Sequence, residues 1–153
     1  MNINNSDIFP YNANIQSIIL HKDKREEIFA LLSQLTSASC IDDKRFNHIL
    51  GMLSFNHNIY VYLENEKIIG MITIFFEQKL IHNGGCVAHI EDLVIDKEHR
   101  SKGIADKLIK FCLSKIRPYT CYKVILNCKK ELIPFYEKND FKEYNVQMSK
   151  YFD

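Results

Sequence analysis

The chain has 153 residues, of which 46% are hydrophobic and 25% are charged, and its formal net charge is +1. This length suits one domain with a real core, and the composition is that of a soluble globular protein. A charge so close to zero argues against nucleic acid or an anionic membrane as a partner. Any anionic ligand must therefore be held by local groups.

Five cysteines are spread along the chain without a C-x-x-C pair. The odd count and the spacing argue against a disulfide framework and against a tetrahedral zinc site, so we expect reduced thiols and no metal. The sequence has no secretion-signal layout and no apolar run near the roughly 20 residues of a membrane span. These features predict a cytoplasmic protein. The cysteines are Cys40, Cys86, Cys112, Cys121 and Cys128.

The N-terminal third predicts an arm, a strand and two helices. Residues 1–14 are rich in Asn and predict a flexible N-terminal arm, and IQSIIL at 15–20 predicts a first strand. Apolar residues at helical spacing predict a helix within 21–38, with Asp23 as its N-cap, and a second helix within 42–55.

The rest of the chain predicts most of a sheet. NIYVYLE at 58–64 and KIIGMITIFFEQ at 67–78 flank a short polar turn, which is typical of a hairpin. CVAHIEDLVID at 86–96 predicts a third long strand, and an apolar stripe predicts a helix within 101–116. The remaining predicted elements are a strand at 121–128, with Cys121 and Cys128 in the core, a helix at 131–139 and a last strand at 145–151.

The predicted order is β-α-α-β-β-β-α-β-α-β, within a single domain at residues 15–153. Short turns join the early strands, which are therefore antiparallel, whereas the strand–helix–strand unit from 86 to 128 predicts a parallel pair. The sequence thus predicts an α/β fold with a mixed, mostly antiparallel central sheet flanked by helices.

Two adjacent acids, Glu91 and Asp92, interrupt the apolar strand at 86–96. Strict alternation puts Glu91 on the face of Ile95 and Asp92 on the face of Val94. A buried carboxylate without partners is costly, so these acids need an explanation. Either the strand frays and the acids cap a bulge, or both acids face a pocket and bind a polar or cationic ligand. The apolar flanks favour the pocket.

The stretch HRSKGIA, residues 99–105, leads from this strand into the next helix. The first amides of a helix have no partner within the helix, and together with the helix dipole they attract phosphate. Glycine lets a ligand approach the backbone, and Arg100 and Lys102 add positive charge. The stretch matches neither a P-loop nor a dinucleotide motif. On these residues alone, a phosphate site and a solvated basic helix start both stay open.

The acidic strand and the R-x-x-G-x-A turn of Arg100, Gly103 and Ala105 resemble the acetyl-CoA-binding motif of the GNAT N-acetyltransferase superfamily. Four further blocks, KLIH, HIEDLVI, CYKVILNC and PFYEKNDF, resemble those of its glucosamine 6-phosphate N-acetyltransferase family. The resemblance covers about residues 27–148. It implies acetyl transfer from acetyl-CoA to the amine of D-glucosamine 6-phosphate, in UDP-N-acetylglucosamine biosynthesis.

The resemblance also implies residue roles. The backbone at Leu93, Val94 and Ile95 would lie along the pantetheine arm, with an amide at Leu93 or Val94 stabilising the oxyanion. Glu91 and Asp92 would border the reacting amine. The phenol of Tyr136 would contact the cofactor and protonate the departing thiolate, although by its sequence context alone Tyr136 is a core aromatic. The implied pyrophosphate contacts are Arg100, Ser101, Lys102, Gly103, Ile104 and Ala105. The implied substrate contacts are Thr36, Lys79, His82, Glu91, Asp92, Tyr122, Lys123, Asn127 and Lys150.

The chain departs from the family pattern at several positions. Asn127 stands where the family has an acid, and Asp140 where Gly or Phe is common. Tyr151 stands where relatives often carry an Arg that reaches the sugar phosphate, so the adjacent Lys150 is assigned that contact. In relatives the last strand crosses between subunits, which implies a homodimer with shared active sites.

Two other functions stay open. One is a GNAT-fold acetyltransferase for another small amine, such as a polyamine or a peptide N-terminus. The other is a non-catalytic acyl-CoA-binding module. A polyamine site should be mostly acidic rather than lined by Lys79, His82 and Lys123. A binding module would keep the Arg100 turn but would need neither Glu91 nor Tyr136.

Overall fold

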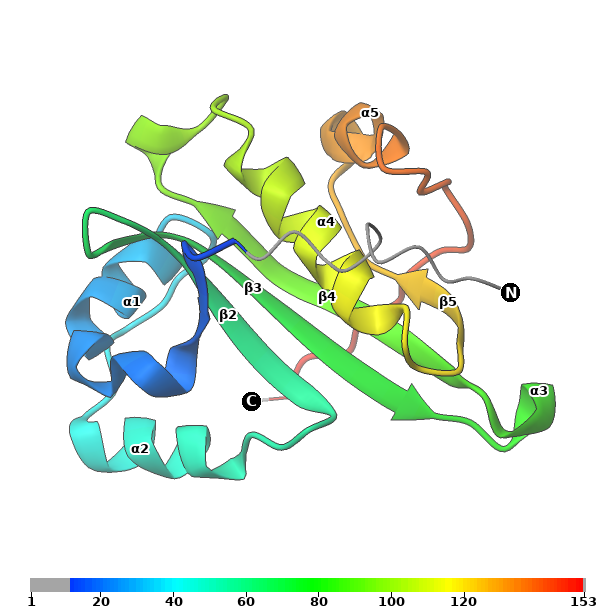
Figure 1. The fold of residues 1–153 in the computed structure, drawn as a ribbon, viewed down its shortest axis with the longest axis horizontal. Helices are drawn as coiled ribbons and strands as arrows, with labels where there is room; N and C mark the ends of the chain where they lie inside the picture. The colour runs from blue at the N-terminus through cyan, green and yellow to red at the C-terminus, as the bar shows by residue number, and fades with distance from the viewer. Residues whose placement is uncertain (1–11, 153) are drawn as a thin grey trace, which may run out of the picture.

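A computed structural model describes residues 12–152 and places five strands in one sheet, in the order β1-β2-β3-β4-β5 (Figure 1). Neighbouring strands are antiparallel except β4 and β5, which are parallel. The predicted mixed, mostly antiparallel sheet is therefore confirmed. The strands are β1 (Ile15–Ser17), β2 (His57–Glu64), β3 (Lys67–Gln78), β4 (Cys86–Ile95) and β5 (Cys121–Ile125).

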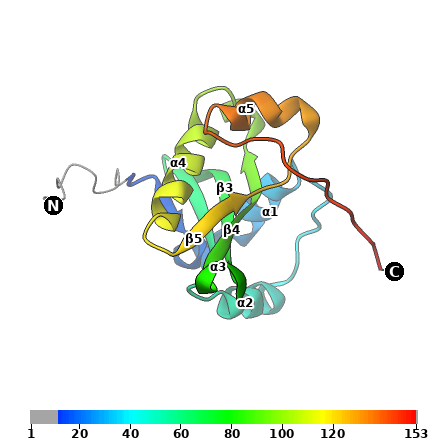
Figure 2. The same ribbon diagram turned by 90° about the vertical axis from the view of Figure 1, so that its right-hand side faces the viewer.

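Helices cover both faces of this sheet (Figure 2). Helices α1 (Arg25–Leu32) and α2 (Asp43–Met52) pack on one face, and α4 (Ile104–Ile116) packs on the other. No helix within residues 12–152 combines the length and the apolar character needed to cross a membrane. The shorter helical segments are η2 (Ile18–Lys24), α3 (Ile81–Gly84), η3 (Lys97–His99), η4 (Lys130–Leu132) and α5 (Ile133–Glu137).

The core consists of two apolar clusters separated by the sheet. The predicted stripe of α4 is buried, with Leu108 and Cys112 fully inside, against Ile72 and Ile74 of β3. Each fully buried aliphatic side chain of this kind contributes roughly 1.5–3 kcal/mol. The second cluster fills the other face with Ile28 and Leu31 of α1, Phe46 and Leu50 of α2, and Val61, Met71 and Val94 of the sheet.

The start of the domain differs from the prediction. Strand β1 ends at Ser17, whose hydroxyl accepts a hydrogen bond from the amide of Ile19 (3.4 Å) and begins a 3₁₀ turn at Ile18. The predicted strand to Leu20 and the predicted N-cap at Asp23 are therefore wrong, because a serine cap bends the chain first. Residues 1–11 of the predicted arm lie outside the described part of the chain.

The end of the chain also differs. Strand β5 stops at Ile125, three residues before the predicted end. The predicted last strand at 145–151 does not form, and Val146 and Met148 there are 88% and 92% exposed. An alternating pattern makes a strand only when a partner strand takes its hydrogen bonds, and this segment pairs with none of the strands in residues 12–144.

The cysteines are not all reduced. Cys86 and Cys121 form a disulfide with their Cα atoms 4.3 Å apart, because they are paired residues of β4 and β5. The prediction of five reduced thiols is therefore wrong for Cys86 and Cys121. The cysteines then no longer support the prediction of a reducing compartment. Cys112 is buried, but Cys40 and Cys128 are exposed, so the prediction that Cys128 lies in the core is also wrong.

Candidate active site

The central cleft opens where β4 and β5 separate. Their parallel pairing ends at His89 and Ile125, and the chain after β5 then turns away from β4 (Figure 1). The space between residues 90–95 and residues 127–129 is a cleft of about 1050 Å³. The start of α4 and one side of α5 close it. The divergence of two paired strands thus creates a site over the backbone of β4.

A β-bulge lies at the two acids. Thr73 of β3 pairs with Glu91, but Met71 pairs with Val94, so β4 contains one residue more than β3 in this interval. Asp92 has a φ of 52°, which lies in the left-handed region. Both acids line the cleft. The two alternatives therefore hold in part: the bulge exists and the acids face a pocket, while β4 stays paired to β3 up to Ile95.

The bulge changes which side chains share a face. Beyond it, Ile95 packs with Ala88 and Ile90 in the cluster under α4, whereas Val94 packs in the cluster under α1. The predicted alternation, with Ile95 on the face of Glu91, is therefore wrong after Asp92. One extra residue in a strand shifts the two-residue period by one, which moves every later side chain to the opposite face.

Glu91 lies in a partly buried, acidic setting. Burial, and then the charge of Asp92, raise the pKa of Glu91 above its ordinary value. Nδ1 of the neighbouring His89 lies 3.9 Å from Oε1 of Glu91, and Nε2 of His89 lies 3.0 Å from Oε2 of Glu77. His89 is thus a strand histidine held between two carboxylates. A carboxyl group whose pKa is raised toward neutrality is better matched to proton exchange at neutral pH.

The turn before α4 has the geometry of an anion site. Gly103 is the N-cap residue of α4, has a φ of 76°, and has no heavy atom within 4 Å of the position where a Cβ would lie. Ser101 is also left-handed, with a φ of 61°. Nε of Arg100 donates to the carbonyl oxygen of Ile95 (3.0 Å), which holds the guanidinium at the cleft. Lys102 is exposed and does not line the cleft.

Tyr136 of α5 is both a core aromatic and a cleft-lining phenol. Its ring packs edge-on against Phe135, with centroids 4.9 Å apart, and only 9% of the residue is exposed. Burial, with a smaller contribution from Cys128, raises the pKa of Tyr136 to about 12. The phenol therefore stays protonated at neutral pH and is able to donate a proton.

Most of the residues assigned to the cofactor and to the amine meet in this cleft. They come from the segment after α1, from β4, from the turn before α4 and from the segment after β5 through α5. Within residues 12–152, no three His, Cys, Asp or Glu side chains are placed to hold a metal ion. The assigned residues that line the cleft are Thr36, Glu91, Asp92, Leu93, Val94, Ile95, Arg100, Ser101, Gly103, Ile104, Ala105, Asn127 and Tyr136.

The assigned phosphate contacts lie elsewhere. The rings of His82 and Tyr122 stack at 4.1 Å, and Nζ of Lys123 lies 5.8 Å from the Tyr122 centroid. Lys79 forms an ion pair with Glu77 nearby. We call Lys79, His82, Tyr122 and Lys123 the basic cluster. It lies toward the start of β4, where Lys123 is paired with Val87, four residues and thus about 13 Å before Glu91. Lys150 lies on the exposed C-terminal segment, with Nζ 5.5 Å from the Phe152 ring, and no residue of these two groups lines the cleft.

Sequence reasoning missed part of the cleft wall. Asn139 is a buried polar residue whose Nδ2 donates to Oδ1 of Asp106 (3.0 Å), which ties the end of α5 to the first turn of α4. Gln34 and His99 also line the cleft. The block PFYEKNDF contains Asn139, but Lys138 and Asp140 flank it, so no local pattern marks it as buried. Nothing local to Gln34 or His99 marks them.

Comparisons with known proteins agree with this geometry. Residues 19–141 match the family described as the Acetyltransferase (GNAT) family. The chain is 35% identical over 136 residues to a glucosamine 6-phosphate N-acetyltransferase of Arabidopsis thaliana, covering 86% of this chain and 91% of the relative. A protein of the same description from Dictyostelium discoideum is 35% identical over 124 residues, covering 78% and 79%.

A solved structure shows the same fold. The crystal structure of glucosamine-6-phosphate N-acetyltransferase from Arabidopsis thaliana superposes with a TM-score of 0.85 at 33% identity, over 91% of this chain and 97% of that one. The family match spans strands β2 to β5, the cleft and the turn before α4. The chain therefore belongs to the acetyltransferase (GNAT) family.

Proposed function

We propose that this protein transfers the acetyl group of acetyl-CoA to the amine of D-glucosamine 6-phosphate, giving N-acetyl-D-glucosamine 6-phosphate and CoA. The reaction is direct transfer within a ternary complex, on the way to UDP-N-acetylglucosamine. The observation that carries the proposal is one cleft that joins an anion-binding turn at Arg100–Gly103 to a pair of acids, Glu91 and Asp92. Relatives at 35% identity with this activity support the choice of a phosphosugar acceptor.

The cofactor half follows from the backbone. Beyond His89, the β5 side of β4 has no strand partner among the described residues, so its amides and carbonyls are free to bond the amides of a pantetheine arm. The free first amides of α4, at Ile104 and Ala105, and the guanidinium of Arg100 suit the pyrophosphate.

The chemistry needs three groups around the thioester. The acceptor amine gives up a proton to Glu91, directly or through water, and its nitrogen attacks the thioester carbon. An amide at Leu93 or Val94 stabilises the negative oxygen of the tetrahedral intermediate. When the C–S bond breaks, the thiolate of CoA takes the proton of Tyr136, and solvent carries the proton of Glu91 back to the Tyr136 phenolate. Asn127, which lines the same cleft, hydrogen bonds the sugar but cannot serve as a base.

The phosphate half of the site is proposed to come from a second chain. The basic cluster does not line the cleft of its own chain, and Lys79 within it is already paired with Glu77. We propose that it completes the cleft of the partner in a homodimer, together with Lys150. The C-terminal segment supports this arrangement, because it places Val146, Met148 and Phe152, each at least 85% exposed, where a monomer would leave them in water.

The test is release of free CoA thiol from acetyl-CoA with three acceptors side by side: glucosamine 6-phosphate, glucosamine and spermidine. We expect kcat/KM for the phosphosugar to exceed the other two by about a hundredfold or more, because charge-assisted bonds to phosphate are each worth about 1.5–3 kcal/mol. Equal turnover of unphosphorylated glucosamine would show that the enzyme does not recognise the phosphate group. Preferred turnover of spermidine would make the acid pair a polyamine site.

A further inference from the structure

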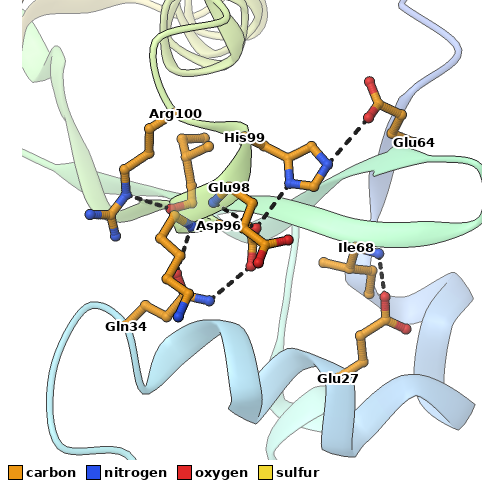
Figure 3. Close-up of polar contacts among 10 residues, drawn as sticks. Glu27, Gln34, Glu64, Ile68, Asp96, Glu98, His99 and Arg100 are labelled. Atoms are coloured by element: carbon orange, nitrogen blue, oxygen red, sulfur yellow. Dashed lines mark hydrogen bonds and ion pairs between the residues drawn. The ribbon is translucent and has the colours of Figure 1, made fainter.

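Asp96 is the centre of a hydrogen-bond network behind the cleft (Figure 3). Its carboxylate accepts from Nε2 of Gln34 (2.9 Å), from Nδ1 of His99 (2.9 Å) and from the amide of Glu98 (3.1 Å). The other end of the Gln34 amide accepts from the amide of Lys97 (2.8 Å). The side-chain amide of Gln34 therefore donates to Asp96 and accepts from Lys97, the two residues that directly follow β4.

These bonds join two walls of the cleft. Gln34 belongs to the segment after α1, which brings Leu35 and Thr36 to the acceptor side. His99 and Arg100 belong to the turn that faces the cofactor phosphates. Asp96 lies between the two walls and does not line the cleft. Its contacts therefore act on ligands only through the residues that they hold.

Both walls are fixed again at their far ends. Nε2 of His99 lies 3.4 Å from Oε2 of Glu64 at the end of β2. Helix α1 is held at its start by Glu27, which accepts from the amide of Ile68 in β3 (Figure 3). The bonds of Gln34 to Asp96 and to the amide of Lys97 thus join the segment after α1 to the turn before α4, in addition to the apolar packing of α1 on β4.

The link is charged and well sheltered. The hydrogen bonds from His99, and then from Gln34, hold the pKa of Asp96 well below its usual range, so the carboxylate is ionised throughout the neutral range. The side chain of Asp96 is 15% exposed, which limits competition from water. Hydrogen bonds to a charged acceptor are about twice as strong as neutral ones.

We propose that Gln34 and Asp96 are a positioning pair, which sets the cofactor-phosphate turn against the acceptor-side wall so that each ligand meets a preformed site. The inference rests on the proposed function, because it assigns acetyl-CoA to the turn and the amine acceptor to the wall. Disturbing the pair weakens the binding of both ligands and leaves the chemical groups, Glu91 and Tyr136, in place.

The experiment exchanges the hydrogen-bond donor and acceptor between positions 34 and 96. In Asp96→Asn the amide nitrogen meets Nε2 of Gln34, donor against donor, and in Gln34→Glu two carboxylates face each other. In the double variant, the new amide at position 96 donates to the new carboxylate at position 34, and its carbonyl oxygen keeps the bonds from Glu98 and His99. Each single variant should raise the Kd of acetyl-CoA and the KM of the acceptor about tenfold, with kcat within about threefold. The double variant should return both to within about threefold of wild type.

Asp43→Asn is the matched control, because it removes the charge of an aspartate that pairs with Arg25 at 2.8 Å and does not line the cleft. It should leave both constants unchanged. Gln34→Ala adds no charge and replaces any single variant that does not fold. Unchanged constants in the singles, or no recovery in the double variant, overturn the positioning pair. Failure of the wild-type protein to bind acetyl-CoA in calorimetry overturns the proposed function instead.

Discussion

Glu91 and Asp92 share the bulge of β4, and this proximity sets the pH at which the cleft can work. Because burial and the charge of Asp92 raise the pKa of Glu91, the carboxylate form is lost as the pH falls through that raised value. We therefore expect kcat/KM to fall on the acid side of a pH–rate profile. Glu91→Gln should lower kcat about a hundredfold and abolish that acid limb.

The contribution of Glu91 to folding stability should depend on pH in the opposite direction. A carboxyl group with a raised pKa favours the folded state most when it is protonated, below the ordinary glutamate pKa of about 4.3, and this contribution is lost as pH rises through the raised value. Glu91→Gln should thus be at least as heat-stable as wild type at neutral pH. If the acid limb of the pH–rate profile persists in Glu91→Gln, the base is another group. Glu98→Gln, at a residue outside the cleft, serves as the control.

Tyr136 is expected to act through its hydroxyl alone. The ring is packed against Phe135 and Phe141, so Tyr136→Phe should keep the melting temperature within a few degrees. Loss of the proton donor should lower kcat by about 10²-fold with little change in the KM of either substrate. Single-turnover measurement of thiol release separates this step from product release. An unchanged chemical step would return Tyr136 to a purely structural role.

Some side-chain roles were visible in the sequence and others were not. The acids at 91 and 92 stood out because carboxylates are rare in an apolar strand. A bulge beneath them was only one of two open alternatives, because it is defined by the pairing of Glu91 and Val94 with Thr73 and Met71, and no local pattern encodes that register. Gln34 was likewise hidden, since its partner Asp96 lies 62 residues away.

Strands β4 and β5 are joined at one end by a disulfide and open at the other. The Cys86–Cys121 bond closes a 35-residue separation, for which loop entropy gives an upper estimate of about 3–4 kcal/mol. Reduction should therefore lower the melting temperature by about 5–10 °C. Titration of the unfolded, unreduced chain should find only the thiols of Cys40, Cys112 and Cys128.

Cys86→Ser with Cys121→Ser should reproduce the effect of reduction, whereas Cys40→Ser should not. Five free thiols in the purified protein would contradict the bond. The strand–helix–strand unit predicted the parallel pair, but spacing does not encode the register that places Cys86 opposite Cys121. The amphipathic pattern of α4 and the hairpin of β2 and β3 were predictable, since both are local. Strand β5 was predicted too long because its end is set by the divergence from β4.

The proposed dimer makes one quantitative prediction. In solution the chain should have twice its 18.0 kDa mass. If the basic cluster serves the partner's cleft, a Tyr136→Phe chain and a His82→Ala, Lys123→Ala chain should each be nearly inactive. Mixed and re-equilibrated, half of the dimers pair one chain of each kind and carry one intact site of two, so about a quarter of wild-type activity should return.

A mixture of Tyr136→Phe with Glu91→Gln, both in the cleft, is the matched control and should regain far less, because every cleft then lacks one group. Absence of recovery in the first mixture would place the sugar phosphate within a single chain. The predicted strand at 145–151 belongs to the same question. Its alternating pattern was recognisable, but it pairs with none of the strands within residues 12–152.

The divergence of β4 from β5 has a consequence unrelated to catalysis. An interior strand with an open edge is a template for strand addition by another molecule, and so for aggregation. Natural sheets blunt such edges with bulges and with charges that point into the gap. β4 carries both devices in one place, at Asp92 and Glu91. The acids proposed to face the acceptor amine therefore also protect the open edge of the ligand-free sheet, so on this proposal colloidal stability and catalysis constrain the same two positions.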